Sequence, residues 1–164
     1  MSSDPIPKEI LPTARQVIVC RDIHFDPSEF EWLIAGPLSV QFLGPGVTFP
    51  FREERLAVYT QLVGGLGSIQ LGVEVRQRTD LIDGTEVSFR VVGTSLSTDP
   101  YTFPGGLNRL AVHELAFRFT EMPFEHEGTY EFRIVALSAE GEVPLEGGAG
   151  AVTYLSSDRG DTGG

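Results

Sequence analysis

The chain has 164 residues and a formal net charge of −11, and its 41% hydrophobic residues suffice for the core of one globular domain. Twelve Lys and Arg stand against 23 Asp and Glu, which disfavours nucleic acid and anionic membranes, because both are bound mainly through cationic side chains. With one cysteine, no basic and apolar leader and no apolar run of about 20 residues, the chain is expected in the cytoplasm without an intrachain disulfide.

Composition divides the chain into an arm, one domain and a tail. Residues 1–13 hold three prolines among polar residues, and we expect a flexible N-terminal arm there. Residues 156–164 are polar and glycine-rich, and we expect a disordered tail. Short apolar segments separated by glycine and proline fill residues 14–155, which we expect to form a single β-sandwich domain.

The first predicted strand, residues 15–23, has apolar side chains on both faces. Val17 and Val19 share one face, and Ile18 and Cys20 share the other. This arrangement is typical of a central strand that is covered on both sides.

Residues 26–42 allow two interpretations. The DPSE sequence at 26–29 suits the capped first turn of a helix that Gly36 would end. The alternation over residues 30–34 instead predicts a strand, with a turn at 26–29 and a bulge at Gly36-Pro37. We favour the strand.

The middle of the chain shows the alternation of half-buried strands. A loop at 44–51 precedes an alternating segment at 56–62, and the glycines of 64–67 form a turn before the strand at 69–75. A turn at 82–84 leads to the next strand. Residues 94–106 are expected to form one long loop, and loops of this length are often functional or mobile. The inward-facing residues of these two strands are Ile69, Leu71, Val73, Val75, Val87, Phe89 and Val91.

The last third of the chain predicts further strands. The apolar phase of residues 110–112 differs from that of 115–119, which predicts a β-bulge at His113–Glu114. Residues 124–146 predict a hairpin at the edge of the sandwich, and residues 150–155 the last strand.

These segments together predict an all-β fold, a two-sheet antiparallel β-sandwich of about 7–8 strands with little or no helix. Each alternating strand has one apolar face, and two sheets packed face to face bury both. The predicted core contains Val19, Leu71, Val73, Phe89, Tyr130, Phe132 and Ile134.

The order of these features resembles a family of small bacterial proteins classed as a domain of unknown function. The resemblance covers about residues 14–155 and implies a β-sandwich of bacterial source, with no characterised catalytic residues. The residues that carry it are Asp22, Asp26, WLIAG at 32–36, Phe49-Pro50, LAVYTQL at 56–62, Gly64 to Gly67, Gly128, Tyr130 and Phe132.

Candidate sites for metals are weak. Asp22, His24 and Asp26 alternate in DIHFD, and on a regular strand they would share a face and form a divalent-metal cluster. We favour a polar strand end whose aspartates accept turn hydrogen bonds. The acidic loop 121–128 lacks the Asp/Asn ladder of tight calcium sites. We therefore expect no metal and no cofactor.

Candidate catalytic residues are equally weak. His113 and His126 would serve as acid–base groups, but loop and bulge histidines are more often solvated. The chain has no Gly-x-Ser-x-Gly motif, and GGLG lacks the lysine of a phosphate loop. We therefore expect no enzymatic activity.

The function expected from the sequence is partner binding. A non-enzymatic protein-interaction or accessory module of a bacterial multi-protein system would bind another protein, one with a basic patch, through loops and strand edges. The expected site is the 94–106 loop with its Tyr101, Phe103 and Pro104 and the neighbouring strand ends. The alternative is a small-ligand or carbohydrate-binding sandwich with Trp32 or Tyr59 as an exposed platform.

Overall fold

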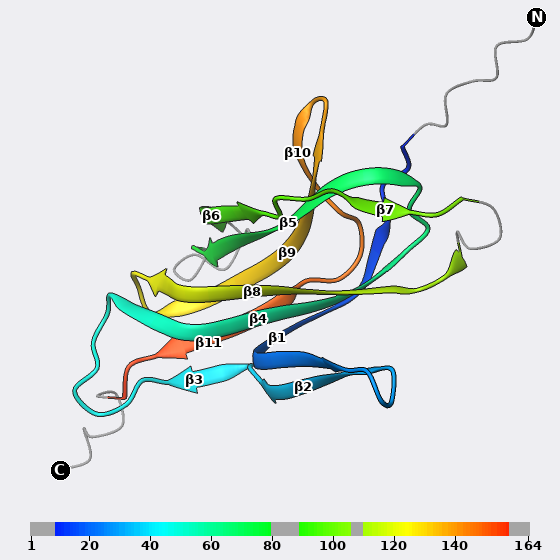
Figure 1. The fold of residues 1–164 in the computed structure, drawn as a ribbon. Helices are drawn as coiled ribbons and strands as arrows, with labels where there is room; N and C mark the ends of the chain where they lie inside the picture. The colour runs from blue at the N-terminus through cyan, green and yellow to red at the C-terminus, as the bar shows by residue number, and fades with distance from the viewer. Residues whose placement is uncertain (1–8, 80–88, 106–109, 158–164) are drawn as a thin grey trace, which may run out of the picture.

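The structure, a computed structural model, describes residues 9–79, 89–105 and 110–157. In these ranges the regular secondary structure is almost entirely β-strand, and two sheets pack against each other (Figure 1). The predicted all-β sandwich is confirmed. No helix in the described ranges is long and apolar enough to cross a membrane.

The smaller sheet has four strands in the order β2-β1-β4-β8. All of its pairs are antiparallel. The bounds are β1 Thr13–Asp26, β2 Glu31–Pro37, β4 Phe51–Val63 and β8 His113–Phe124.

The larger sheet has the order β3-β11-β9-β5-β6, with β10 added to β9 and β7 added to β5. The sandwich was predicted to be antiparallel, and one pair differs, because β11 and β3 are parallel. The strand number also exceeds the prediction, because β3, β7 and β10 are too short to show an alternating pattern. The bounds are β3 Val40–Phe42, β5 Gly67–Arg78, β6 Phe89–Leu96, β7 Tyr101–Phe103, β9 Gly128–Ser138, β10 Gly141–Pro144 and β11 Gly150–Leu155.

The main core lies between the two sheets. The inward residues of β5 follow the predicted alternation, since Ile69, Leu71, Val73 and Val75 are all buried. Of the seven predicted core residues, all but Phe89 belong to this cluster. Phe89 is half-buried and lies under the guanidinium of Arg76, 4.0 Å from its ring centre.

A second, smaller core covers the opposite face of β1. Cys20, Ile23, Ala57 and Tyr59 are buried there, and Trp32 and Ile34 of β2 pack against them. Both faces of β1 therefore carry buried side chains, as predicted, but the second core consists only of residues from the smaller sheet itself. Arg118 of β8 donates a hydrogen bond to the Ile23 carbonyl oxygen at 2.5 Å, which ties the end of β1 to this face.

The ambiguous segment after Asp26 is a strand, as favoured, but it divides in two. β2 pairs with β1 in the smaller sheet, whereas β3 pairs with β11 in the larger one. Gly36, with φ of +62°, precedes the change of sheet. At Gly36-Pro37, where a bulge was predicted, the chain therefore leaves the smaller sheet and crosses to the larger one.

Three local predictions are wrong. β8 pairs with β4 in one uninterrupted register from His113 to Phe124, so the phase change reflects the start of the strand, not a bulge. The hairpin at 124–146 is not at the edge, because β9 lies between β5 and β11. Val91 was predicted to point inward but faces solvent, with 55% of its surface exposed. Val87 and the turn at 82–84 lie outside the described residues.

Both predicted flexible ends contribute contacts to the domain. Ile10 and Leu66 exchange two backbone hydrogen bonds of 3.0 and 2.9 Å. Ser156 donates its backbone N–H to Glu127 at 3.1 Å. The rest of the arm before residue 9 and of the tail after 157 lies outside the described residues.

Candidate functional site

The hairpin of β1 and β2 projects from the lower edge of the sandwich (Figure 1). Its strands pair down to Asp26 and Glu31, which leaves a four-residue turn at 27–30. Asp26 organises this turn, because its Oδ1 accepts the backbone N–H of Ser28 at 2.9 Å and the Ser28 hydroxyl at 2.6 Å. These hydrogen bonds favour the charged carboxylate and lower the pKa of Asp26.

The turn ends on Phe30, whose backbone is strained. Its φ of +53° lies in the left-handed region, which costs a residue with a Cβ about 1–2 kcal/mol. Its side chain gains little burial in return, since Phe30 is 82% exposed. A strained backbone that presents a large apolar ring to solvent is a feature that clusters at binding sites.

Phe30 belongs to a small aromatic group that we call the aromatic tip, which consists of Phe25, Phe30 and Trp32. The ring centres of Phe25 and Phe30 are 6.2 Å apart, and those of Phe25 and Trp32 are 5.5 Å apart. Phe25 is 43% exposed, while Trp32 packs against the second core. The tip is therefore an apolar surface with one fixed side and one open side.

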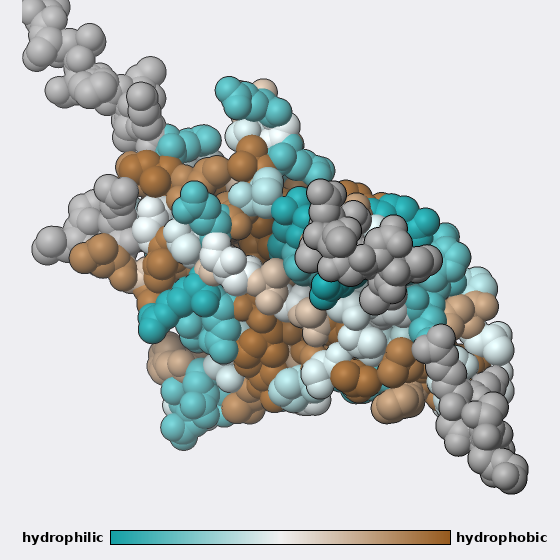
Figure 2. Space-filling model, turned by 180° about the vertical axis from the view of Figure 1, so that it is seen from behind, coloured by the Kyte–Doolittle hydropathy of each residue, from teal (hydrophilic) through white to brown (hydrophobic). Residues whose placement is uncertain are grey.

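Three carboxylates lie in the same hairpin as the aromatic tip. Asp26 is half-buried and Glu29 and Glu31 are exposed, and none of the three forms a salt bridge with a lysine or arginine among the described residues. At the lower left of Figure 2, where this hairpin lies, hydrophobic side chains sit between hydrophilic ones. The tip thus presents an apolar centre with an acidic rim.

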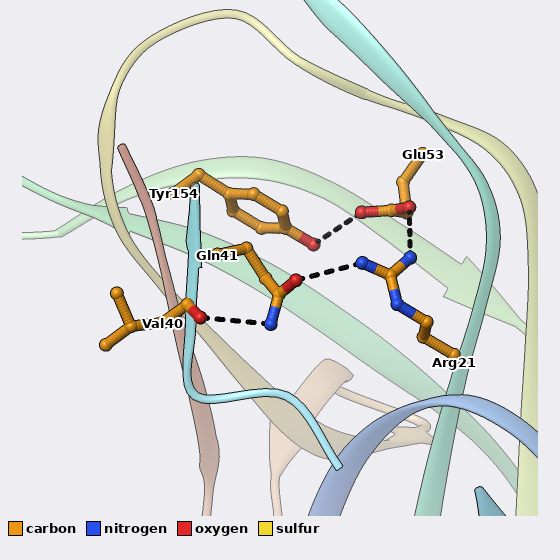
Figure 3. Close-up of polar contacts among 5 residues, drawn as sticks. All are labelled: Arg21, Val40, Gln41, Glu53 and Tyr154. Atoms are coloured by element: carbon orange, nitrogen blue, oxygen red, sulfur yellow. Dashed lines mark hydrogen bonds and ion pairs between the residues drawn. The ribbon is translucent and has the colours of Figure 1, made fainter. Parts of the chain in front are cut away.

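A pocket of about 500 Å³ opens at one end of the sandwich, between β1 and β4 of one sheet and β3 and β11 of the other. Four polar side chains meet there (Figure 3). Glu53 accepts hydrogen bonds from Arg21 at 3.0 Å and from the Tyr154 hydroxyl at 3.3 Å. Arg21 also donates to Gln41 at 2.9 Å. Burial and the adjacent Glu53 carboxylate raise the pKa of Tyr154 far above its usual value.

The residues predicted to bind a partner lie largely inside the domain. Residues 94–106 are not one loop, because β6 extends to Leu96 and β7 pairs with β5. Phe103 is 2% exposed and belongs to the main core. Tyr101 is half-buried and its hydroxyl lies 2.7 Å from Nδ1 of His113. Pro104 is half-buried.

Phe103 is buried because it closes the core above the turn between β4 and β5. Its ring centre lies 4.8 Å from that of Tyr101 and 5.1 Å from that of His113. A Cβ at Gly65 would meet the Phe103 ring at 2.8 Å, so only glycine leaves room for it. Phe103 is consequently unable to contact a partner in this structure.

The residues of the weak metal alternative do not form a cluster. No group of three or more His, Cys, Asp or Glu gathers in a metal-binding arrangement within residues 9–79, 89–105 and 110–157. The Asp22 Oδ1 accepts the Ile23 backbone N–H at 2.8 Å, and Asp26 orders the turn. His24 is exposed. The favoured interpretation, aspartates that accept turn hydrogen bonds, fits Asp26 in particular.

The predicted ligand platform is absent at Tyr59. This residue is 4% exposed, and its hydroxyl donates to Glu114 and accepts from Gln61 at 2.9 Å. Burial and Glu114 raise the pKa of Tyr59. Trp32 is half-buried and belongs to the aromatic tip, and it takes no part in the hydrogen bonds of the Tyr59 hydroxyl.

Sequence reasoning missed Phe30 and Glu53. Phe30 follows the DPSE turn directly, and an aromatic residue at the last position of a turn is a signal that was available. Glu53 gave no signal, because Arg52, Glu53, Glu54 and Arg55 are a charged run of the kind that is usually solvated. No protein-family model matches the chain, and no curated protein matches it, so the family resemblance remains a prediction.

Proposed function

We propose that this protein is a non-enzymatic interaction module that binds another protein through the aromatic tip. The observation that carries the proposal is Phe30, which is 82% exposed on a backbone with φ of +53°. Exposed aromatic residues are the side chains that most often dominate binding energy at interfaces. The strain at Phe30 is tolerated although the side chain gains little burial, which favours a role outside folding.

The support beneath the tip makes it suitable for recognition. Trp32 packs on the second core, and Asp26 holds the turn through two hydrogen bonds. A preorganised surface loses little conformational freedom on binding, which favours affinity. The proposed binding surface is therefore the β1–β2 hairpin. It replaces Tyr101, Phe103 and Pro104, for which the sequence predicted this role.

The acidic rim defines the chemistry of the partner. Asp26, Glu29 and Glu31 would complement an apolar pocket bordered by lysine or arginine. The same carboxylates oppose insertion of the aromatic rings into an anionic membrane surface. The proposal includes a bacterial source and a cytoplasmic location, where the protein would bind such a partner.

Affinity capture with matched variants tests the proposal. Wild-type protein, Phe30→Ala and the control Phe42→Ala are used as baits in extracts of the source organism, since Phe42 is 68% exposed on β3, away from the hairpin. We expect Phe30→Ala to lose a partner that Phe42→Ala retains, and complex formation to slow as salt screens the acidic rim. Capture of the same proteins by all three baits would contradict the proposal.

A second candidate function is small-ligand binding, and the pocket around Glu53 is the observation that favours it. Its volume of about 500 Å³ lies within the range of ligand pockets.

A further inference from the structure

The pocket at the end of the sandwich, lined by Arg21, Gln41, Phe42, Glu53 and Tyr154 among others, has an unusual floor for a β-sandwich. Glu53 points inward, and its side chain is only 13% exposed. Next to it, Tyr154 is fully buried, and its ring packs in tilted contacts on Phe51 and Phe124, with ring centres 5.2 and 4.4 Å away. A carboxylate is therefore held at the boundary between the aromatic core and solvent.

The ion pair at the floor leaves hydrogen-bonding capacity free on both partners. A carboxylate has about four acceptor positions, and Glu53 uses two of them among the described residues. A guanidinium has five N–H groups, and Arg21 uses two, one toward Glu53 and one toward Gln41. The two side chains, which both line the pocket and are hydrogen-bonded to each other (Figure 3), thus carry unused donors and acceptors side by side.

Adjacent donors and acceptors match a ligand with neighbouring hydroxyl groups. Each hydroxyl both donates and accepts, so one hydroxyl donates to the Glu53 carboxylate while the next accepts from Arg21. At the rim, the Phe42 ring is 68% exposed and offers an apolar surface to the C–H face of a ring-shaped ligand.

The charge balance of the lining gives no net attraction for an ion of either sign. Arg21, Arg52 and Arg55 are matched by three carboxylates, and the innermost pair neutralises itself. An anion would meet the Glu53 carboxylate, and a cation would meet the Arg21 guanidinium. A neutral ligand avoids both repulsions.

From this geometry we propose that the pocket binds a neutral saccharide, whose vicinal hydroxyls bridge Glu53 and Arg21 and whose ring stacks on Phe42. The volume of about 500 Å³ leaves room for a mono- or disaccharide. This site is separate from the aromatic tip, and it stands whether or not the tip binds a protein.

Amide NMR titration of the full chain tests the proposal. The probes are glucose, galactose, mannose, N-acetylglucosamine, maltose and cellobiose, each at ~50 mM, which is about ten times the dissociation constant of a weak site of ~5 mM. Inorganic phosphate and glycylglycine serve as anionic and zwitterionic probes. We expect at least one saccharide to shift the amide signals of Arg21, Gln41 and Phe42, with saturation.

Two variants in the pocket and one outside it complete the design. Glu53→Gln, which keeps the size of the side chain, is expected to weaken saccharide binding about tenfold, or about 1.4 kcal/mol. Phe42→Ala, at an exposed position that leaves folding intact, is expected to weaken it as well. Phe30→Ala is expected to bind saccharide as wild type does, which separates this site from the aromatic tip.

Three outcomes would overturn the proposal. The first is the absence of signal shifts with every saccharide. The second is a response to phosphate or glycylglycine alone, which would assign the pocket to a charged ligand. The third is saccharide binding that Phe42→Ala leaves unchanged, because the sugar would then lie elsewhere on the chain.

Discussion

Replacing Phe103 with alanine separates a core role from a binding role for the segment that the sequence singled out. Phe103 is 2% exposed, and burying a phenylalanine of this kind stabilises the fold by about 1.5–3 kcal/mol. Its ring contacts with Tyr101 and His113, at 4.8 and 5.1 Å between centres, each add about 0.5–1.5 kcal/mol. The truncation should therefore cost about 3–5 kcal/mol, the range for a buried Phe→Ala change that leaves a cavity.

The cost is measured by urea denaturation of wild type and variant, with the midpoint expected to fall at an unchanged m-value. The melting temperature should fall by roughly 6–20 °C, since about 1 kcal/mol corresponds to 2–4 °C in a chain of this size.

Phe30→Ala is the matched control, because it makes the same chemical change at a residue that is 82% exposed. It should alter the free energy of unfolding by no more than about 0.5 kcal/mol. A loss of under about 1 kcal/mol for Phe103→Ala would refute the argument, since the ring would then be no part of the core.

Three further predictions follow from other parts of the fold. Burial raises the pKa of all four tyrosines in the folded protein. The stability that the neutral tyrosines contribute is therefore complete below pH ~10, the unfolded pKa, and declines as the pH rises through their pKa values in the folded state. An absorbance titration of tyrosinate in the native chain with a midpoint near 10 would contradict this. Cys20 is fully buried, and its thiol donates a hydrogen bond to the Ala57 carbonyl oxygen at 3.6 Å. A thiol-specific disulfide reagent should therefore react with Cys20 only after unfolding. Fast labelling of the native chain would show instead that the second core opens. Gly147→Ala should lower the free energy of unfolding, measured in urea, by at least about 1 kcal/mol. The new Cβ would lie 2.0 Å from the Ala14 carbonyl oxygen, at a backbone φ of +114°. Unchanged stability would mean that the backbones of Gly147 and Ala14 do not pack this closely.

The sequence by itself determined the elements whose side chains alternate. In β5 the period of two places Ile69, Leu71, Val73 and Val75 on one face, and the structure buries all four. The two apolar faces of β1 also predicted buried side chains on both sides of the strand, and the main core and the second core contain them. These predictions succeed because the pleat of a strand converts sequence parity directly into the face on which a side chain lies.

Only the tertiary structure decided where the apolar residues outside that alternation belong. Phe103 and Phe30 both lie in short segments beside turns, yet one fills the core over Gly65 and the other stands in solvent. No local pattern distinguishes them, because burial there depends on whether a distant part of the chain arrives to cover the ring.

The pocket around Glu53 depends on tertiary structure for the same reason. Arg21, Gln41, Glu53 and Tyr154 come from four strands, and Tyr154 lies 101 residues along the chain from Glu53. They meet because the chain crosses from one sheet to the other after Gly36, which brings β3 beside β11 and opposite the start of β4. The local sequence specifies that these residues are polar, but only the packing of the two sheets brings their side chains within hydrogen-bonding distance.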